Sequence, residues 1–407
     1  MNQSTRNGTT WNDVSSILSK PPFERENGAT YAGEHGHATL PRFRAEGCAM
    51  STMRRVAVVA AVSIICIGSI NRAFKAQRAA SSDKRNGALF AIRTPARKDC
   101  GVTPYTIADR LGFLAEEGLR IQWTRQTQPS LLIPSIVRGD IDVSEFPPNT
   151  LAVAKAGGAP ITGVAEAEIE PEDSSIDPKY RSVWWFINPE KLPNVKSFAD
   201  VGRSVTNRKI KFTTSNPNID GSDFESKLLA SSYRIPINHI EWVSIPDVQA
   251  IEALKLGHVD VSAVHAHFYV EMEKAGARKI ADSSETGLGR AAGITYWTFH
   301  DRFIKEHPDK AAAWVRALRR AQAWANSNPE GARKFTIEAI GQPVTGTQYY
   351  SESKGVDSEL AARWLNDLVQ SGLIPAGRVT TKNLVTQQIA TINESIYASR
   401  DRLLASP

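Results

Sequence analysis

The chain has 407 residues, of which 41% are hydrophobic, so it is long enough for two domains that each bury a core. Its 49 Lys and Arg residues exceed its 43 Asp and Glu residues and leave a net charge of +6. The basic residues are scattered and do not form a stripe with interleaved aromatic residues, so we expect no nucleic-acid binding.

The first 85 residues differ in composition from the rest. Residues 1–49 are rich in Asn, Ser, Thr, Gly and charged residues without a sustained apolar period, which predicts disorder. A basic pair then precedes an apolar stretch at 56–70, whose length of about 15 residues is typical of a signal peptide and short for a membrane span. Residues 50–85 are therefore interpreted as a signal peptide, with translation starting at Met50 or Met53, or as a membrane anchor and linker. The expected location is periplasmic or extracytoplasmic.

The cysteines are few and widely spaced. They are Cys48, Cys66 and Cys100, and removal of the leader would leave Cys100 alone, without a partner for an intrachain disulfide. No Cys or His spacing matches a zinc site. We expect neither a cofactor nor a metal.

Residues 88–163 alternate between strand and helix patterns. An apolar strand at 88–92 is followed by a helix around 105–111 and a strand at 119–124. Gly112 and Gly118 supply the conformations that a helix end requires. Two further helix-to-strand steps follow, so this region predicts an α/β fold.

Several phrases in this region resemble a known family. They are Ala108–Leu119, Gly139–Asp142 and Ala156–Pro160, with a second Gly-x-x-Asp step at Gly257–Asp260. The chain resembles, over about residues 88–341, the periplasmic solute-binding proteins of ABC importers for sulfonates, nitrate, taurine and thiamine precursors. The resemblance implies two doubly wound α/β lobes around a central cleft, of the periplasmic binding protein type II kind. It also implies hinge closure on the ligand, an ABC permease as partner and a monomeric protein.

The two lobes are expected at defined residues. Lobe one should comprise 86–190 and 290–407, including C-terminal helices that pack on it, and lobe two 191–289. The aromatic strand at 182–187 is assigned to the end of the first stretch of lobe one, where the chain crosses between lobes, and 294–299 is the return strand. The other elements expected in lobe two are strands at 209–213, 240–243 and 259–264 and helices at 222–232, 247–256 and 266–275.

The candidate ligand-binding residues come from loops at the carboxyl ends of strands, where open α/β sheets bind ligands. In lobe one, Cys100, Gly101 and Thr103 precede a helix, whose backbone N–H groups can face an anion. Asn149 opens the next such helix, and Phe146 is a candidate apolar wall.

A second loop of this kind lies in lobe two. Thr214, Ser215, Gly221 and Ser222 lie between a strand and a helix, and hydroxyl groups at a helix N-terminus suit a sulfonate, carboxylate or nitrate. The alternative is that Ser222 or Asp220 only caps the helix.

Three further candidates stand at strand ends or crossovers. His265 follows the strand at 259–264, a position at which the resembling proteins line their pocket. The alternative is that it is an ordinary polar residue. Trp184 can stack on an organic ligand or pack in a core. Arg290 can bind an acid group bidentately or lie in solvent.

The acidic residues argue against a simple anion as the ligand. Glu145, Glu166 and Glu168 end or follow strands of lobe one, and carboxylates repel anions. A zwitterion such as an aminosulfonate, or a ligand with an amine or a protonated ring, reconciles both signals. We therefore expect a small organic anion or zwitterion as ligand.

An enzyme on the same fold is the alternative. The chain is similar in one respect to the aryl sulfinate desulfinases, which use a Cys in the loop after the first strand as nucleophile, because Cys100 has a comparable place. The His that those enzymes carry after the second strand has no counterpart in residues 126–136. A binding protein is therefore favoured over an enzyme.

Overall fold

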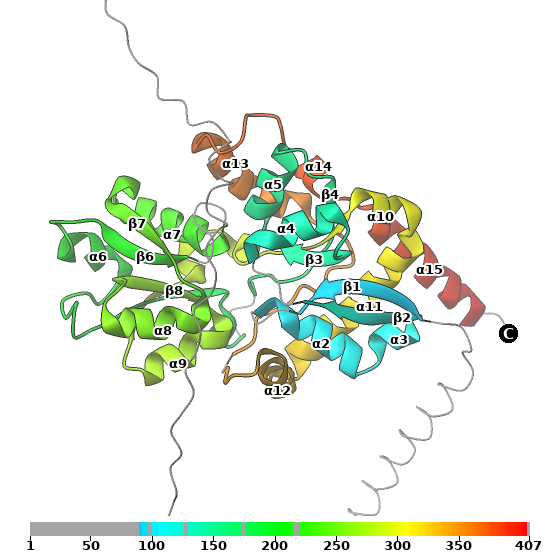
Figure 1. The fold of residues 1–407 in the computed structure, drawn as a ribbon, viewed down its shortest axis with the longest axis horizontal. Helices are drawn as coiled ribbons and strands as arrows, with labels where there is room; N and C mark the ends of the chain where they lie inside the picture. Colours follow the sequence, from blue (N-terminus) through cyan, green and yellow to red (C-terminus); the bar gives the residue numbers. More distant parts are fainter. Residues whose placement is uncertain are drawn as a thin grey trace, which may run out of the picture. The chain divides into compact units, whose positions relative to one another are not determined.

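The computed structural model describes residues 89–96, 100–125, 129–172, 176–214, 220–344 and 346–404 (Figure 1). The predicted disordered extension, the leader and Ser215 lie outside these residues. Within the described ranges, no helix is both long enough and apolar enough to span a membrane.

One layer of five strands, called the first sheet, is built mainly from the N-terminal half. Its strands are β1 (Phe90–Pro95), β2 (Leu119–Thr124), β3 (Val143–Phe146), β4 (Ile161–Glu166) and β10 (Tyr296–His300). β1 and β2 pair in parallel, and β10 pairs antiparallel with both β3 and β4. The Asp142 N–H donates to the Arg93 carbonyl (2.8 Å), and the Thr94 hydroxyl donates to the Val143 carbonyl (3.3 Å). β1-β2 and β3-β10-β4 are thus two separate ladders, and these two bonds hold them side by side in one layer with the order β2-β1-β3-β10-β4.

Helices cover both faces of the first sheet. On one face, α2 (Thr103–Arg110), α3 (Phe113–Glu116) and α11 (Pro308–Ser327) pack against a core that contains Trp297 and Trp314. On the other face lie α4 (Pro129–Arg138) and α5 (Pro148–Ala156). The predicted helix ends at Gly112 and Gly118 are confirmed, since both have positive φ angles of 80° and 75°.

The second sheet has the strand order β7-β6-β8-β5-β9. Its strands are β5 (Val183–Ile187), β6 (Ile210–Thr214), β7 (Ile240–Ser244), β8 (Val261–His265) and β9 (Arg278–Asp282). β6 is parallel to β7 and β8, whereas β5 runs antiparallel to β8 and β9.

The position of β5 corrects the assignment of the strand at 182–187 to lobe one. Its ladder partners are β8 and β9, so it belongs to the second sheet. All five of its side chains are buried, because helices cover both faces of this sheet. A continuous aromatic and β-branched run suits such a central strand.

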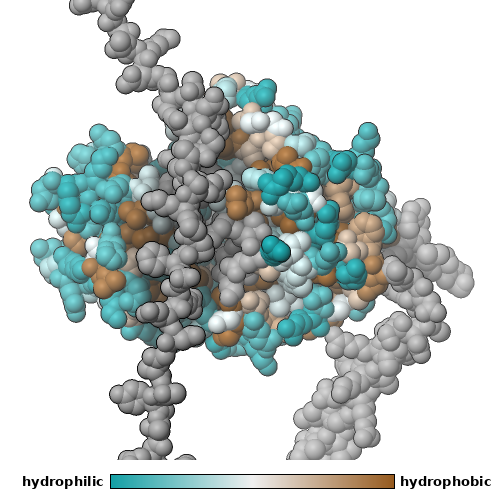
Figure 2. All heavy atoms as spheres, in the orientation of Figure 1, coloured by the Kyte–Doolittle hydropathy of each residue, from teal (hydrophilic) through white to brown (hydrophobic). Residues whose placement is uncertain are grey.

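Consecutive residues of β5 show how the helices are layered. Trp185 faces the core beneath α6 (Phe198–Ser204) and α7 (Gly221–Ser232). Trp184 faces the core beneath α8 (Asp247–Leu256) and α9 (Tyr269–Lys274). The second sheet is thus doubly wound, and the visible atoms over α6 and β7 are mostly hydrophilic (Figure 2).

Two crossovers connect the sheets, and the described parts of the first, 167–172 and 176–182, contact the second, 283–295. The Ala167 N–H donates to the Thr295 carbonyl (2.8 Å), and the Ser182 N–H donates to the Ser283 hydroxyl (3.1 Å). Gly293 has φ +65°, and a Cβ there would lie 2.2 Å from that of Ser182. Only glycine allows this close approach.

The C-terminal region is helical. Its α-helices are α10 (Asp301–Glu306), α11, α12 (Pro329–Ile340), α13 (Ala362–Gln370), α14 (Thr381–Leu384) and α15 (Gln388–Leu404). The 3₁₀ helices of the described chain are Cys100–Val102, Pro178–Tyr180, Ile237–His239, Ala266–Phe268, Ser283–Thr286, Gly289–Ala291 and Ser358–Ala361. α13 contacts α5, but it also reaches α7, because the rings of Trp364 and Phe224 lie 4.4 Å apart.

We expect Trp364→Ala to lower the free energy of unfolding by about 3–5 kcal/mol, as for other large-to-small changes of buried aromatic residues. Trp364 is only 1% exposed, and its Nε1 donates to the Ala291 carbonyl at 3.0 Å. Chemical denaturation would measure the change. Tyr397→Ala, at a ring that is 37% exposed, is the control, and an equal loss in both variants would contradict the prediction.

Candidate functional site

The carboxyl ends of the parallel strands lie next to the crossovers in both sheets. β4 ends at Glu166, where the first crossover begins, and this crossover leads to Val183, the first residue of β5. Val183 pairs with His265, the last residue of β8. Residues that follow β4, β6 and β8 are therefore brought close to one another, at the edge where α/β sheets bind ligands.

A polar group that we call the Asp220 cluster lies at this edge and consists of Asn149, Thr214, Asp220 and Ser222. The Asn149 side-chain amide donates to the Asp220 carbonyl at 2.8 Å. The hydroxyls of Thr214 and Ser222 donate to the Asp220 carboxylate at 3.4 and 3.3 Å. Three predicted site residues thus meet at Asp220, and the bond from Asn149 to its backbone carbonyl joins α5 on the first sheet to α7 on the second.

Asp220 occupies the N-cap position of α7, without a capping hydrogen bond from its side chain. The helix N-terminus that the sequence predicts as an anion site therefore already holds a carboxylate. Its negative charge is favourable there, because it faces the positive end of the helix dipole. A ligand at this point meets a negative charge as well as hydroxyl groups.

His265 is a second charged element beside the cluster. Its Nδ1 lies 2.6 Å from the Asp247 carboxylate, which also accepts the His265 backbone N–H at 3.0 Å. Burial alone would lower the pKa of His265, but the charge and hydrogen bond of Asp247, together with Asp220 and Glu168, raise it to about 10. The imidazole is therefore protonated at neutral pH, and its side chain is 21% exposed.

Glu225, one turn further along α7, is fully buried. Burial raises the pKa of Glu225 to about 8, and the negative charge of Glu170 adds to the shift. One carboxyl oxygen accepts the Gly293 N–H at 3.0 Å, and the other has no hydrogen-bond partner among the described residues. Glu225 is thus a neutral, half-satisfied acid between α7 and the second crossover.

His267 is buried nearby and uncharged. Burial lowers its pKa to about 3, and the charge of His265 acts in the same direction. Neither ring nitrogen has a partner within the part of the chain that the structure describes.

Two arginines at this edge, among the residues that the structure describes, are paired with carboxylates. Arg290 lies 3.5 Å from Glu166 and 4.0 Å from Glu172, and Arg181 lies 2.8 Å from Glu170. The predicted bidentate contact of Arg290 with a ligand thus competes with Glu166.

Other predicted site residues have structural contacts. The Thr103 hydroxyl lies 2.6 Å from that of Thr336 on α12. Gly221 lies against the Trp364 ring, and Gly101 belongs to the 3₁₀ turn before α2. Cys100 is described by its backbone alone.

Two predicted aromatic contacts are corrected by the structure. Phe146 is 3% exposed within the core beneath α4 and α5, so it is no open apolar wall. The Trp184 ring stacks on Tyr269 at 4.5 Å, and the Lys279 ammonium lies 3.7 Å from its centre. A ring held between these two groups has no face left for a ligand.

Asp247 and Glu225 were missed by the sequence reasoning. Asp247 lies in the first turn of α8, where an acid signals a helix start, and only its pairing with His265 distinguishes it. Glu225 lies in a polar stretch of α7 and gives no local sign of its burial.

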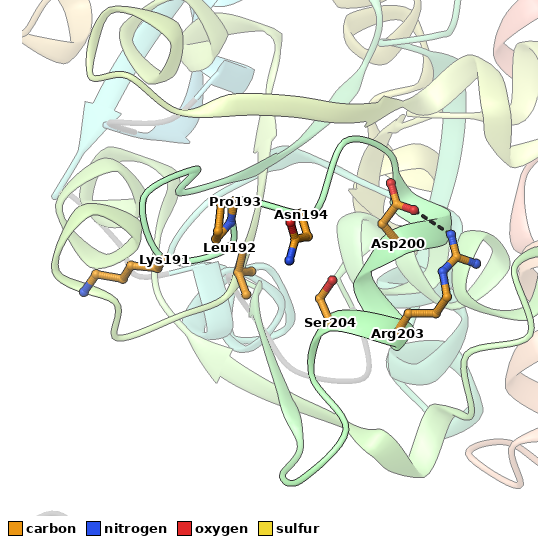
Figure 3. A pocket seen from close by; sticks show the side chains of 7 residues that line it. All are labelled: Lys191, Leu192, Pro193, Asn194, Asp200, Arg203 and Ser204. Carbon is orange, nitrogen blue, oxygen red and sulfur yellow. Dashed lines mark hydrogen bonds and ion pairs between the residues drawn. The ribbon is translucent and has the colours of Figure 1, made fainter.

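Two cavities lie elsewhere. One of about 450 Å³ is lined by Lys191, Asp200, Arg203 and four neighbours (Figure 3). Its Asp200 is held by the N-terminus of α6 and by Arg203, while Lys191 extends to the Leu256 carbonyl. The other, of about 300 Å³, includes Arg93 and Asp142. Both lie at the amino-terminal edges of the parallel strands, opposite the Asp220 cluster.

No group of three or more His, Cys, Asp or Glu side chains within the described ranges has the arrangement of a metal site.

We expect Asp247→Asn to destabilise the protein by about 3 kcal/mol at pH 7, because it leaves His265 without its partner. The folded-state pKa of His265 is raised, so the pair contributes fully below pH 6.5 and loses its contribution as the pH rises to about 10. The difference between wild type and variant should therefore shrink toward pH 10. Denaturation across this range and NMR titration of His265 would measure both effects, and a wild-type midpoint near 6.5 would contradict them.

We also expect Glu225→Gln to flatten the pH dependence of stability. The folded-state pKa of Glu225 is raised to about 8, so the unfolded chain releases this proton first as the pH rises. The wild-type free energy of unfolding should fall between pH 5 and 8, by at most about 1.4 kcal/mol per pH unit, and the variant should lack this loss. Glu252→Gln, at an exposed acid, is the control for the removal of a charge. Parallel curves for wild type and Glu225→Gln would refute the assignment.

Comparisons with known proteins indicate the family of the chain. Residues 98–341 match the model of the NMT1-like family. A taurine-binding periplasmic protein of Escherichia coli (strain K12) is 20% identical over 219 residues, which are 54% of this chain and 61% of that protein. The chain thus spans less than two thirds of this relative.

Solved structures show the same fold. The periplasmic aliphatic sulphonate-binding protein SsuA from Escherichia coli has a TM-score of 0.55 at 17% identity, covering 73% of this chain and 92% of its own. The periplasmic nitrate-binding protein NrtA from Synechocystis PCC 6803 has a TM-score of 0.56 at 14% identity, covering 78% and 90%. At such identities the likeness concerns the fold, which is that of periplasmic binding proteins.

Proposed function

The chain belongs to the NMT1-like family, and we propose on this premise that it is the substrate-binding component of an ABC importer. It captures a small organic solute, an anion or a zwitterion, and delivers it to a permease in the membrane. The observation that carries the proposal is the family match over more than half of the chain, on a fold shared with sulfonate- and nitrate-binding proteins.

The proposed binding site is the Asp220 cluster with His265. Two lobes would meet there, the first sheet with its C-terminal helices and the second sheet with α6 to α9. The two crossovers would form the hinge, and a solute that contacts both lobes stabilises the closed arrangement by its differential affinity. Residues 50–85 would direct the protein to the periplasm as a leader, or hold it there as an anchor.

The capture and delivery of a solute require no enzymatic step. The named relatives are binding proteins, and a desulfinase would need an activated nucleophile at Cys100. Cys100→Ser should therefore change solute affinity only modestly.

The direct test is a thermal-shift and calorimetric screen of the full-length protein against sulfonates, nitrate, carboxylates and amino acids. We expect one class to raise the melting temperature in a saturable way, because a ligand that binds only the folded state stabilises it. The absence of any saturable ligand would contradict the proposed function.

Thr214→Val should locate the site. This change removes the hydroxyl that donates to Asp220 and keeps the side-chain volume, so the dissociation constant of the solute should rise about tenfold while the fold is retained. The matched control is Thr162→Val, which removes a hydroxyl at the opposite edge of the first sheet, where it donates to Asp301. Equal affinities of both variants would move the site away from the Asp220 cluster.

A further inference from the structure

A third segment of the chain, residues 346–351, lies against the first crossover and is called the brace segment. The Ile169 N–H donates to the Tyr349 carbonyl (3.0 Å), and the Ser351 N–H donates to the Ala167 carbonyl (2.9 Å). The first crossover also bonds to the second, so three segments of the chain meet at this place.

The brace segment is fixed to the first lobe by α11. The Asn326 side-chain amide donates to the Tyr350 carbonyl (2.9 Å), and its oxygen accepts the Tyr350 N–H (3.0 Å). Gln322, one turn earlier, donates to the carbonyls of Ala167 and Ser351 at 2.7 and 3.1 Å. Since α11 packs in the core of the first sheet, the brace segment moves with the first lobe.

The start of the brace segment touches the second lobe beside α9. A Cβ on Gly346 would lie 2.0 Å from the carbonyl oxygen of Ala266 and 2.9 Å from its carbonyl carbon. The two backbones are thus in direct contact, without room for a methyl group. Ile340 and Val344, which precede the brace segment, share an apolar core with Phe268 of the second lobe. The first lobe therefore cannot move closer to the second at this point.

Beyond the end of the brace segment, α13 touches the second lobe at α7. The rings of Trp364 and Phe224 lie 4.4 Å apart, and the Lys227 ammonium lies 3.8 Å from the Asp367 carboxylate. α7 and α9 cover opposite faces of the second sheet (Figure 1). The first lobe thus contacts the second lobe on both of these faces.

The two contacts resist bending in opposite directions. A bend that separates α7 from α13 presses Ala266 onto Gly346, where backbone atoms already touch. A bend in the other direction presses Trp364 onto Phe224, whose rings are already packed. Closely packed groups of this kind are hard to compress, so either bend needs one contact to be rearranged.

We propose that residues 346–351 and α13 form a brace that limits bending between the two lobes and sets how far they separate around the proposed site. The inference rests on the two-lobe part of the proposed function and adds a third segment to its hinge. Ala266 directly follows His265, so one contact of the brace lies next to the proposed site. The brace acts in the same way whichever solute binds.

Hydrogen exchange of the full-length wild-type protein tests the attachment of the brace segment. The amides of Ile169 and Ser351 both donate across this contact. We expect their protection factors to lie within about tenfold of that of the Ala167 amide, because residues of one cooperative unit open together. Lower protection than this at both amides would overturn the inference, since a loosely held segment limits no motion.

The separation of the lobes is measured by pulsed electron spin resonance on pairs of nitroxide labels. Thr391→Cys on α15 and Glu252→Cys on α8 place one label at an exposed position in each lobe, in a full-length protein whose three native cysteines are replaced by Ser. Without any solute, we expect a single narrow distance distribution. Two separate distances in this protein would overturn the inference.

Variants at the two contacts test the brace itself in the labelled protein. Gly346→Ala should widen the distance distribution about twofold, because the added Cβ pushes the brace segment off Ala266 and admits further arrangements. Trp364→Leu keeps an apolar side chain but removes the ring contact with Phe224, and it should also widen the distribution. The double variant should show the broadest one. The matched control is Gly355→Ala, where a Cβ finds its nearest neighbour at 3.5 Å and the width should not change.

Widths in Gly346→Ala and Trp364→Leu that equal that of the control would overturn the inference. If either variant fails to fold, hydrogen exchange and the distance distribution without these two changes decide the question. None of these measurements uses a solute, so their failure leaves the proposed binding function intact. The solute screen tests that function separately.

Discussion

The structure depends on the close passage of the two crossovers between the sheets. Backbone hydrogen bonds link residues 167 and 295, and Glu170 accepts hydrogen bonds from both the Ser182 N–H and the Ser283 hydroxyl. Because Gly293 has no side chain, the second crossover can lie directly against Ser182. This contact fixes where the carboxyl ends of both sets of parallel strands meet. The polar residues of the proposed site come from both sheets and become neighbours through that arrangement.

The burial of charged groups is the main unfavourable contribution to stability at the proposed site. Asp247 and His265 satisfy each other, and Asp220 takes hydroxyl hydrogen bonds, but Glu225 cannot be matched and stays neutral. A core built only for stability would replace such a group by an apolar side chain. Its presence beside the proposed hinge agrees with the tendency of perturbed pKa values to gather at functional sites.

Local signals in the sequence were sufficient to predict most helices and strands. The strand at 119–124 and the helix at 247–256 have the predicted bounds, because glycines and alternating apolar residues mark them directly. Thr214 and Ser222 were predicted as site residues from their place between a strand and a helix, and their role in binding stays a prediction. The contacts of Trp184 and the burial of Glu225 were not predictable in this way. They depend on Tyr269 and Gly293, which are distant in the sequence. The residues next to Trp184 and Glu225 in the sequence therefore do not indicate these contacts.

The contact of Trp364 with α7 links the helices on the two sheets through side chains. α13 belongs with the helices on the first sheet, yet the indole ring of its Trp364 touches Phe224 and lies close to Gly221, next to Asp220. Separation of the two sheets would break this aromatic contact and expose both rings to water. The side-chain contact therefore opposes any motion that separates the two sheets, and a movement of that kind would have to repack α13 against α7.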